Sequence, residues 1–553
     1  MTFAEAKTEN RPPKTKKKKR LLAALLCLLL ISTVLVFLLV PFFIRVNGGQ
    51  TVTVEVNTDY DDPGATNILT GAHIDGAGYV DTGSIGAYTL TYSWLLQNRY
   101  RTVIVADTLA PQIELIGRSI ITPVGEEYTD PGFVVTDNYD SDLNDLVRVS
   151  DNVDTAAAGK YAIVYTVSDS SGNTASAERQ VLVVEDDFSY CREVKNLSEN
   201  DQALLPPITA FLDQYYRSLK YLQHCDFSDL FASGASDQAY LAEAAAAATV
   251  DYRSQVENDL RMDDCSYAID ITGVERAADG SVNVSFTEDM IMKYRFLNGT
   301  ESRQTDLANS FMLTEEGGGY VIAELHREEG PFQFFMEMED ASDRAKIDQL
   351  RERYVNSSLE AQKRYEEEKA QINAGAVCPE PNFAHPYNRD EAGSYAVKYA
   401  LTRNGQYGDL ESNCANYVSQ CIHAGGVPMD GVSPYQWKFF SNVHDEESAD
   451  TGYTASWVYI PMFADYMRNG DIVTQEDIWV YFAQPGDVIV MLSSEDKDIS
   501  ESPHVVIVSE CVTDAEGNLQ DILYCGNTND QLNLPLSFTA APSKKLLKIY
   551  GYN

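Results

Sequence analysis

One long uncharged run dominates the hydrophobic pattern near the start of the chain. Residues 21–44 (LLAALLCLLLISTVLVFLLVPFFI) contain no charged side chain. A helix needs about 20 apolar residues to cross the hydrocarbon core of a bilayer. The pattern therefore predicts a transmembrane helix over residues 21–44.

The charges around this run predict its orientation. Residues 1–20 contain eight Lys and Arg side chains, whereas Arg45 is the one charge directly after the run. The positive-inside rule places such a basic tail in the cytoplasm and the rest of the chain outside. A cleaved signal peptide is the alternative, but its apolar region would span about 7–15 residues and end in small residues. We expect an uncleaved single-pass type II anchor in the cell membrane.

Alternating apolar and polar positions follow in two related segments, residues 50–108 and 109–186. The first contains Tyr60-Asp-Asp-Pro-Gly64 and the second Tyr128-Thr-Asp-Pro-Gly132. Each copy ends in alternating runs separated by turn residues, which is typical of antiparallel strands with one buried face. A repeated module of this kind predicts two small β-sandwiches. The repeated motif resembles that of bacterial immunoglobulin-like (Ig-like) surface domains, which implies a spacer or adhesive role.

The middle of the chain changes pattern twice. Residues 190–340 start with helical periodicity and continue as strand-like runs, which predicts an α+β domain. Its order of elements resembles the α+β roll of SnoaL-like domains. Residues 341–385 contain a charged helix without a wide apolar stripe, followed by a proline-rich linker. Such a helix usually bridges domains, so we expect a helical stalk there.

The last segment, residues 386–553, contains a cysteine at the predicted start of a helix. In the run ESNCANYVSQCIHAGG, Asn413 is a plausible N-cap and Cys414 occupies the first turn. The partial positive charge of a helix N-terminus stabilises a thiolate and lowers the pKa of the cysteine. We therefore expect Cys414 to be a nucleophile. A buried structural cysteine is the alternative.

A histidine and an asparagine follow on predicted strands. His504 stands at the start of an apolar strand, and Asn527 stands at the end of the next one. In papain-like hydrolases a histidine accepts the thiol proton and a polar side chain orients the imidazole ring. The order predicts a Cys414, His504 and Asn527 triad. Asn529 and Asp530 remain alternatives for the third member.

The longer pattern around Cys414 resembles a known family. The matching residues are Asn413-Cys414-Ala-Asn416-Tyr-Val-Ser-Gln420, Gly425-Gly426, Trp437, Ser456-Trp457, Pro485-Gly486-Asp487 and His504. They resemble the putative amidase domain family of Gram-positive bacteria, relatives of CHAP and NlpC-type peptidoglycan hydrolases. The resemblance covers nearly all of residues 386–553 and implies a papain-like fold. Two departures are Asn413 and Asn527, where the family has Asp and often His.

Three further residues are candidates for substrate binding: Trp437, Trp457 and Asn416. For both tryptophans, packing in the core is the alternative. No H-E-x-x-H motif or close pairing of histidines is present, so we expect no metal and no cofactor. Cys511 and Cys525 flank a turn, and a disulfide across that hairpin remains open.

The charge and the motifs together predict the function. A net charge of −41 repels nucleic acid, so we exclude a nucleic-acid partner. The predicted fold is multidomain: a transmembrane helix, two Ig-like β-sandwiches, an α+β roll, a charged linker helix and an α+β papain-like domain. We expect an extracellular cysteine amidase or peptidase that acts on cell-wall peptidoglycan peptides. The alternative is a surface adhesion or scaffold protein with an inactive amidase-like domain.

Overall fold

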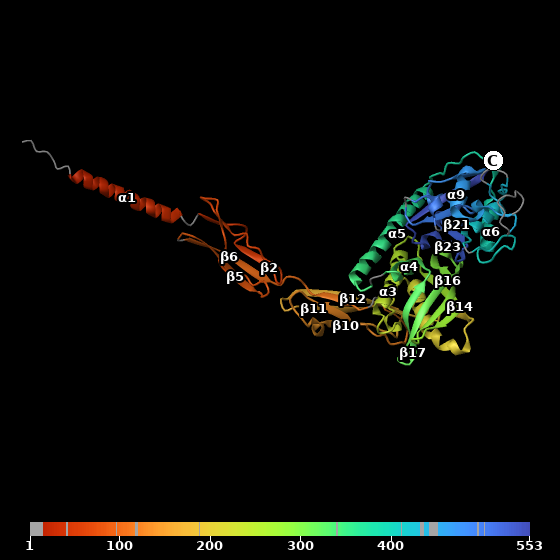
Figure 1. Ribbon diagram of the computed structural model, residues 1–553, viewed down its shortest axis with the longest axis horizontal. Helices are drawn as coiled ribbons and strands as arrows, with labels where there is room; N and C mark the ends of the chain where they lie inside the picture. The colour runs from red at the N-terminus through yellow and green to blue at the C-terminus, as the bar shows by residue number, and fades with distance from the viewer. Residues whose placement is uncertain are drawn as a thin grey trace, which may run out of the picture. The chain divides into compact units, whose positions relative to one another are not determined.

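The computed structural model of the protein divides the chain into two compact units (Figure 1). The first contains Met1–Ile116, Pro131–Asp151 and Ile163–Glu178, and the second contains Gly117–Asp130, Asn152–Ala162 and Arg179–Asn553. The structure describes residues 15–39, 43–95, 97–116, 120–186, 189–338, 341–410, 412–431, 436–441, 452–494, 497–502 and 504–553.

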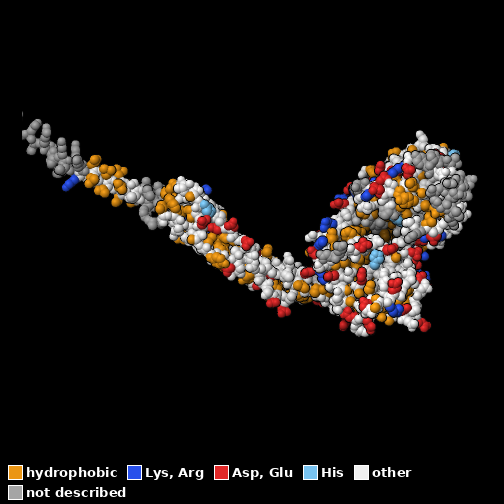
Figure 2. All heavy atoms as spheres, viewed as in Figure 1, with side chains coloured by type: hydrophobic (Ala, Val, Ile, Leu, Met, Phe, Trp, Pro, Cys, Tyr) orange, Lys and Arg blue, Asp and Glu red, His pale blue; other side chains and the backbone are white. Residues whose placement is uncertain are grey.

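Helix α1 (Thr15–Leu39) forms over most of the predicted transmembrane run. Its described side chains, residues 19–34, are exposed, and Figure 2 shows the hydrophobic ones along the helix. Within the described residues, no helix is long and apolar enough to cross a membrane. Residues 40–42 of the predicted span lie outside the described residues. The transmembrane helix predicted for residues 21–44 is therefore not confirmed.

The first repeat is a β-rich module. Its strands are β1 (Ile44–Val46), β2 (Thr51–Glu55), β3 (Ala65–Asn67), β4 (His73–Ile74), β5 (Gly86–Trp94) and β6 (Gln97–Ala106). They form two three-stranded sheets in the orders β1-β3-β4 and β2-β6-β5. The Tyr-x-Asp-Pro-Gly motif has a structural role here. Asp62 of the motif accepts a hydrogen bond from Tyr92 (2.8 Å) and pairs with the fully buried Arg101, whose charge it neutralises.

The second repeat is also built from short strands. They are β7 (Gln112–Leu115), β8 (Ile120–Pro123), β9 (Phe133–Thr136), β10 (Arg148–Asp151), β11 (Gly159–Ser168) and β12 (Thr174–Val184). Strand β7 pairs with β9 and β10 with β11, both antiparallel, and β12 pairs with β8 in parallel. The motif again provides an ion pair, Asp130 with the buried Arg179 at 3.2 Å. The β-rich character predicted for both repeats is confirmed.

Within the second unit, residues 191–336 form an α+β region in which one short strand precedes two helices, four long strands and a further helix. The predicted order of helices before strands holds for all but the short first strand. The elements of this region are α2 (Leu205–Tyr221), α3 (Ser236–Arg253), β13 (Cys191–Lys195), β14 (Met262–Arg276), β15 (Val282–Tyr294), β16 (Ser302–Glu316), β17 (Gly319–Arg327) and α4 (Gly330–Met336). The sheet order is β13-β14-β15-β16, and β17 pairs with residues 309–316 of β16. The many small side chains of α3 are buried, which lets this helix pack closely.

The charged helix predicted as a stalk is α5 (Arg344–Asn373). It packs along α3 and reaches the C-terminal domain (Figure 1). Ile347, Val355 and Ala361 are buried on its inner face. The Tyr365 hydroxyl accepts a hydrogen bond from Lys544 N (2.6 Å) and donates one to Lys544 O (3.2 Å). This packing against both neighbours was not predicted from the sequence.

The C-terminal domain has an α+β fold. Its elements are β18 (His385–Pro386), α6 (Arg389–Tyr399), α7 (Cys414–Ala424), α8 (Ala455–Val458), α9 (Ile460–Asn469), β19 (Ile472–Gln475), β20 (Val488–Leu492), β21 (His504–Thr513), β22 (Leu519–Gly526), β23 (Gln531–Pro535) and β24 (Ser543–Tyr552). The strand order is β23-β22-β21-β20-β24-β18, and both α6 and α7 contact β21. The thiols of Cys511 and Cys525 are free, because the register places Cys525 opposite Ile507.

One sheet runs through residues 191–336 and the C-terminal domain. Strand β16 of the first part pairs with β23 of the second, through Arg303 opposite Leu532 and Gln304 opposite Gln531. One hydrophobic core also serves both parts, since it contains Leu534 and Ile522 together with residues of α2 and α3. The two parts therefore pack as one body.

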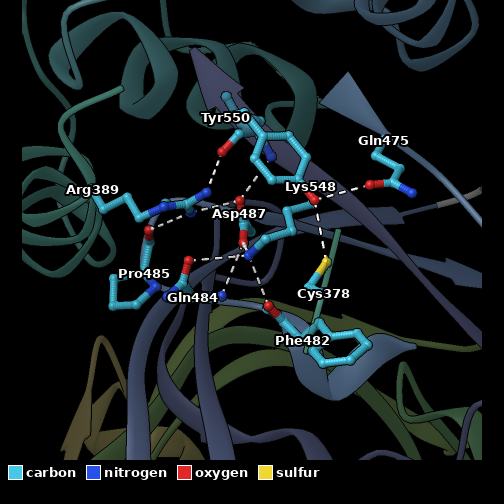
Figure 3. A network of polar contacts seen from close by, with 12 residues as sticks. Cys378, Arg389, Gln475, Phe482, Gln484, Pro485, Asp487, Lys548 and Tyr550 are labelled. Carbon is cyan, nitrogen blue, oxygen red and sulfur yellow. Dashed lines mark hydrogen bonds and ion pairs between the residues drawn. The ribbon is translucent and has the colours of Figure 1, made fainter. Parts of the chain in front are cut away.

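The Pro-Gly-Asp motif anchors the start of β20 through Asp487, whose side chain is fully buried (Figure 3). Its carboxylate accepts hydrogen bonds from the side chains of Arg389 (2.7 Å) and Lys548 (3.2 Å) and from the backbone of Gln484 (2.9 Å) and Ile549 (2.8 Å). Four donors compensate the burial of the negative charge. Asp487 thus joins α6, β20 and β24.

Candidate active site

Cys414 is the first residue of α7, and its side chain is largely buried. The thiol lies beside the backbone N–H groups of Cys414, Ala415 and Val505 and beside the Thr528 hydroxyl. These donors lower the pKa of the thiol, but burial raises it by more, so that the net direction is upward. The expectation of a lowered cysteine pKa is therefore wrong for this structure. Burial raises the pKa of the thiol by more than the donors at the helix N-terminus lower it.

The contact with Val505 brings Cys414 to the start of β21, where His504 is the preceding residue. The backbone of His504 is fixed by Ser502, whose hydroxyl accepts from His504 N (3.1 Å) and donates to His504 O (2.6 Å). The predicted nucleophile and the predicted base therefore come from elements that contact each other, α7 and β21.

The His504 side chain is half-buried, and desolvation of its imidazole lowers its pKa to about 4. The side chain of Gln531 lies beside the ring and opposes this shift. A Cβ atom built on Gly526 would lie 2.8 Å from Gln531 Oε1 and 3.3 Å from His504 Nε2. A larger residue at position 526 would therefore displace the Gln531 carboxamide and press on the His504 ring. Gln531 Oε1 has no partner at hydrogen-bond geometry among the described residues, so its contact with the ring is not a well-formed hydrogen bond.

Asn527, the predicted third member, has other partners. Its Nδ2 donates to Ala400 O (3.0 Å), and its Oδ1 accepts from the side chain of Asn413. Of the two alternatives, Asp530 pairs with Arg403 at 2.6 Å and Asn529 lies at a positive φ of 51° in the turn. Among these polar groups the structure places none against His504, and it places Gln531 there instead.

Gln531 was missed by the sequence analysis. It carries the same carboxamide group as asparagine, and it begins β23 four residues after Asn527. Polar residues on both sides of the turn between β22 and β23 were the signal that could have found it. The choice between them depends on strand register, which the pattern does not give.

Replacing Gln531 with Ala is expected to lower kcat, because the imidazole loses the group that restricts its orientation. We expect a loss of up to about 10²-fold, the lower end of what a positioned general base contributes. KM should change less than kcat, and the acid limb of the pH profile should move to lower pH. Steady-state kinetics across pH would check this. Asn527→Ala is the matched control, and an equal effect of both variants would contradict the positioning role.

Trp437, Trp457 and Asn416 lie in the core of the domain. Both tryptophans are fully buried, and their ring centroids are 4.4 Å apart. Trp457 Nε1 donates to Asn416 Oδ1 (2.9 Å), and Trp437 Nε1 donates to Ser419 Oγ (3.1 Å). Their polar atoms are thus used inside the domain, which fits the packing alternative for both indoles.

A cavity of about 270 Å³ lies within the second unit. Gln531 and Asn529 line it from the C-terminal domain, as does Met491, which lies opposite His504 in the β20–β21 register. Arg253 lines it from α3, with its guanidinium 3.8 Å from the centroid of the Phe538 ring. The cavity is lined by polar and aromatic groups, as ligand sites commonly are, and it shares Gln531 with the surroundings of His504.

Comparisons with known proteins agree with this architecture. Residues 386–551 match the family model described as Putative amidase domain, and residues 44–105 and 113–183 match the one described as Bacterial surface protein, Ig-like domain. The C-terminal part of the chain thus matches a putative amidase domain, and the part before it matches bacterial surface Ig-like domains. These domains fit an amidase-like surface protein and suggest a hydrolase of amide bonds.

A curated relative is similar over a short stretch. The "Uncharacterized protein YhbB" of Bacillus subtilis (strain 168) is 48% identical over 48 residues, which is 9% of this chain. The chain matches 15% of the length of that relative.

Proposed function

We propose that the protein is a membrane-anchored, extracytoplasmic cysteine amidase or peptidase that acts on peptides of cell-wall peptidoglycan. The observation that carries the proposal is the position of the Cys414 thiol. It lies at the start of α7 and beside the backbone of β21 next to His504. The match of residues 386–551 to an amidase domain supports the reaction class.

The proposed reaction proceeds through a thioester. His504 accepts the thiol proton of Cys414, and the thiolate attacks the carbonyl carbon of the amide. The backbone N–H of Cys414 stabilises the oxyanion. The C–N bond then breaks, and the amine leaves with the proton held by His504. Water, deprotonated by His504, attacks the thioester and releases a carboxylic acid and the free thiol.

A neutral Cys414 thiol and a neutral His504 imidazole fit a reaction in which the proton moves during the attack. Burial raises the pKa of Cys414 and lowers that of His504 to about 4, so a thiol and a neutral imidazole face the substrate at neutral pH. The proton then moves as the thiol attacks. A thiolate held in advance is not required.

Activity is expected to be lost as the pH falls through about 4, the pKa of His504, because a protonated imidazole cannot accept the thiol proton. An unburied histidine would lose its basic form near pH 6.5. The pH profile of kcat/KM would check this. An acid limb near pH 6.5 would contradict the lowered pKa of His504.

The peptidoglycan substrate and the membrane anchor extend the proposal. The two surface Ig-like domains support an extracytoplasmic location. The basic residues before position 21 and the apolar run after it support an N-terminus in the cytoplasm.

Digestion of purified peptidoglycan by the full-length protein tests the function. Mass spectrometry should find new amine and carboxylate ends that are absent with Cys414→Ala. Release of sugar fragments alone, or equal release by the variant, would overturn the proposal.

A second candidate is a surface adhesion or scaffold protein with an inactive amidase-like domain. The raised pKa of the buried Cys414 thiol favours this reading, because an unreactive thiol has the same property. A cysteine-reactive probe distinguishes the two. Cys414 should react faster than the fully buried Cys421 of the same helix in an enzyme, and at the same slow rate in a scaffold.

A further inference from the structure

Three aspartates meet in the first unit, far along the sequence from the amidase domain. Asp107 directly follows β6, Asp137 directly follows β9, and Asp140 lies three residues further on. One carboxylate oxygen from each lies within 4.8 Å of those of the other two. The ends of two strands therefore bring three negative charges to one point.

Asp107 is buried but has no compensating partner. Its side chain is 6% exposed, and both of its carboxylate oxygens are buried without a hydrogen-bond partner among the described residues. Asp137 Oδ2 and Asn138 Oδ1 are buried and unpartnered as well. Buried polar atoms are nearly always paired, and a buried carboxylate without a partner is costly. Two of the three clustered aspartates, and the asparagine next to one of them, thus have buried oxygens without a hydrogen-bond partner among the described residues.

Neighbouring contacts fix the direction of these oxygens. Asp137 Oδ1 accepts from the backbone N–H groups of Tyr139 and Asp140 (both 2.9 Å), which leaves Oδ2 for another partner. Asn138 Nδ2 donates to Glu55 Oε1 (2.9 Å), which orients Oδ1 away from that contact. The geometry is therefore held in place by contacts outside the cluster.

The carboxylate of Asp140 is also fixed. It accepts hydrogen bonds from the backbone N–H of Ser170 (2.8 Å) and from the Ser170 hydroxyl (3.0 Å). The carboxylates of Asp137 and Asp140 are thus both oriented by hydrogen bonds to one side, while Asp107 is not.

We propose that Asp107, Asp137, Asn138 and Asp140 form a calcium site. All four provide oxygen atoms, which suits a hard cation, and no thiol or imidazole belongs to the set. Calcium takes six to eight oxygen ligands at about 2.3–2.6 Å, with water completing the shell. Oxygens within 4.8 Å of one another fit around one such ion. Magnesium is less suited, because it demands near-octahedral geometry at about 2.0–2.1 Å.

The site would tie the two Ig-like repeats together within the first unit. Asp107 belongs to the connection that follows the first repeat, and the other three residues belong to the second repeat. The inference is independent of the proposed amidase chemistry, and it differs from the expectation that no metal is bound.

Thermal unfolding of the full-length protein tests the proposal, with EDTA-treated protein compared before and after 10 mM CaCl₂. The transition of the first unit should rise by about 5–10 °C when calcium reaches a hundred times its Kd. Magnesium at the same concentration should raise it less. Asp107→Asn should abolish the calcium effect without lowering the Tm in EDTA, because it removes an unpaired charge.

Asp145→Asn is the matched control, since Asp145 is an exposed acid of the same repeat. It should keep the full calcium effect. Calorimetric titration of the wild type with CaCl₂ gives a second readout, with one calcium per chain expected at a Kd of about 10⁻⁴–10⁻³ M or tighter. No shift and no binding by the wild type would overturn the site. So would an equal loss of the shift in both variants.

Discussion

Replacing Cys414 with Ala is expected to abolish amide hydrolysis, with kcat lowered by about 10⁴-fold or more. The reason is that the thiol forms the bond to the acyl group, and no other described group beside it can take that role. The thiol lies among the backbone N–H groups that would stabilise the oxyanion. Substrate binding should survive, because alanine keeps the start of α7. Rates with a peptidoglycan peptide, together with its Kd for the variant, would measure both effects.

Cys421→Ala is the matched control for this experiment. Cys421 lies on the same helix and is fully buried, but it belongs to the core. Its replacement should reduce stability and leave kcat within about threefold of the wild type. An unchanged rate in Cys414→Ala would rule out a nucleophilic role for this cysteine.

Replacing Asp487 with Ala is expected to destabilise the second unit by about 3–5 kcal/mol. The substitution removes the carboxylate but leaves the Lys548 ammonium, whose side chain is 5% exposed, without its counter-charge. Arg389 loses its partner at the same time, and two backbone N–H groups lose their acceptor. Leaving one partner of a buried ion pair uncompensated is the costly case. Denaturation in urea, followed by tryptophan fluorescence, would measure the loss.

Two further substitutions separate charge from hydrogen bonding. Asp487→Asn keeps an acceptor oxygen and should lose less stability than Asp487→Ala. Glu516→Ala removes an exposed acid in a turn and should change the free energy of unfolding by no more than about 0.5 kcal/mol. A similar small change in Asp487→Ala would show that the network contributes little.

The positions of Cys414 and His504 could be predicted because each depends on a single helix or strand. The helix around Cys414 has apolar spacing and a clear start, so the sequence placed the cysteine on its first turn. His504 was likewise predictable as the first residue of an apolar strand. Both predictions depend on local periodicity, which the chain displays directly.

The third polar group depends on pairing between strands, which local periodicity does not determine. Strand β23 pairs with β22 with Gly526 opposite Gln531, and the register shifts between Tyr524 and Gly526. A one-residue shift sends a side chain to the other face of the sheet. Asn527 therefore turns to Asn413, and Gln531 lies beside His504.

The raised pKa of Cys414 and the packing of α5 could not be predicted from the sequence, and the two have a related reason. A helix N-terminus is visible in the sequence, but the burial of the thiol depends on what the rest of the fold places over it. The charged surface of α5 suggested a bridging helix, whereas residues remote in sequence cover its inner face. Burial depends on the whole fold. It determines the direction of the Cys414 pKa shift, and it determines which face of α5 packs against its neighbours.

The C-terminal domain of this protein cannot be separated from the preceding residues by cutting the chain at residue 386. Cutting there would leave the edge of β23 without β16, and the shared hydrophobic core would open to water at Leu534 and Ile522. An exposed edge strand beside apolar surface promotes aggregation. Residues 191–553 are therefore expected to be needed together for the C-terminal domain to stay folded and soluble.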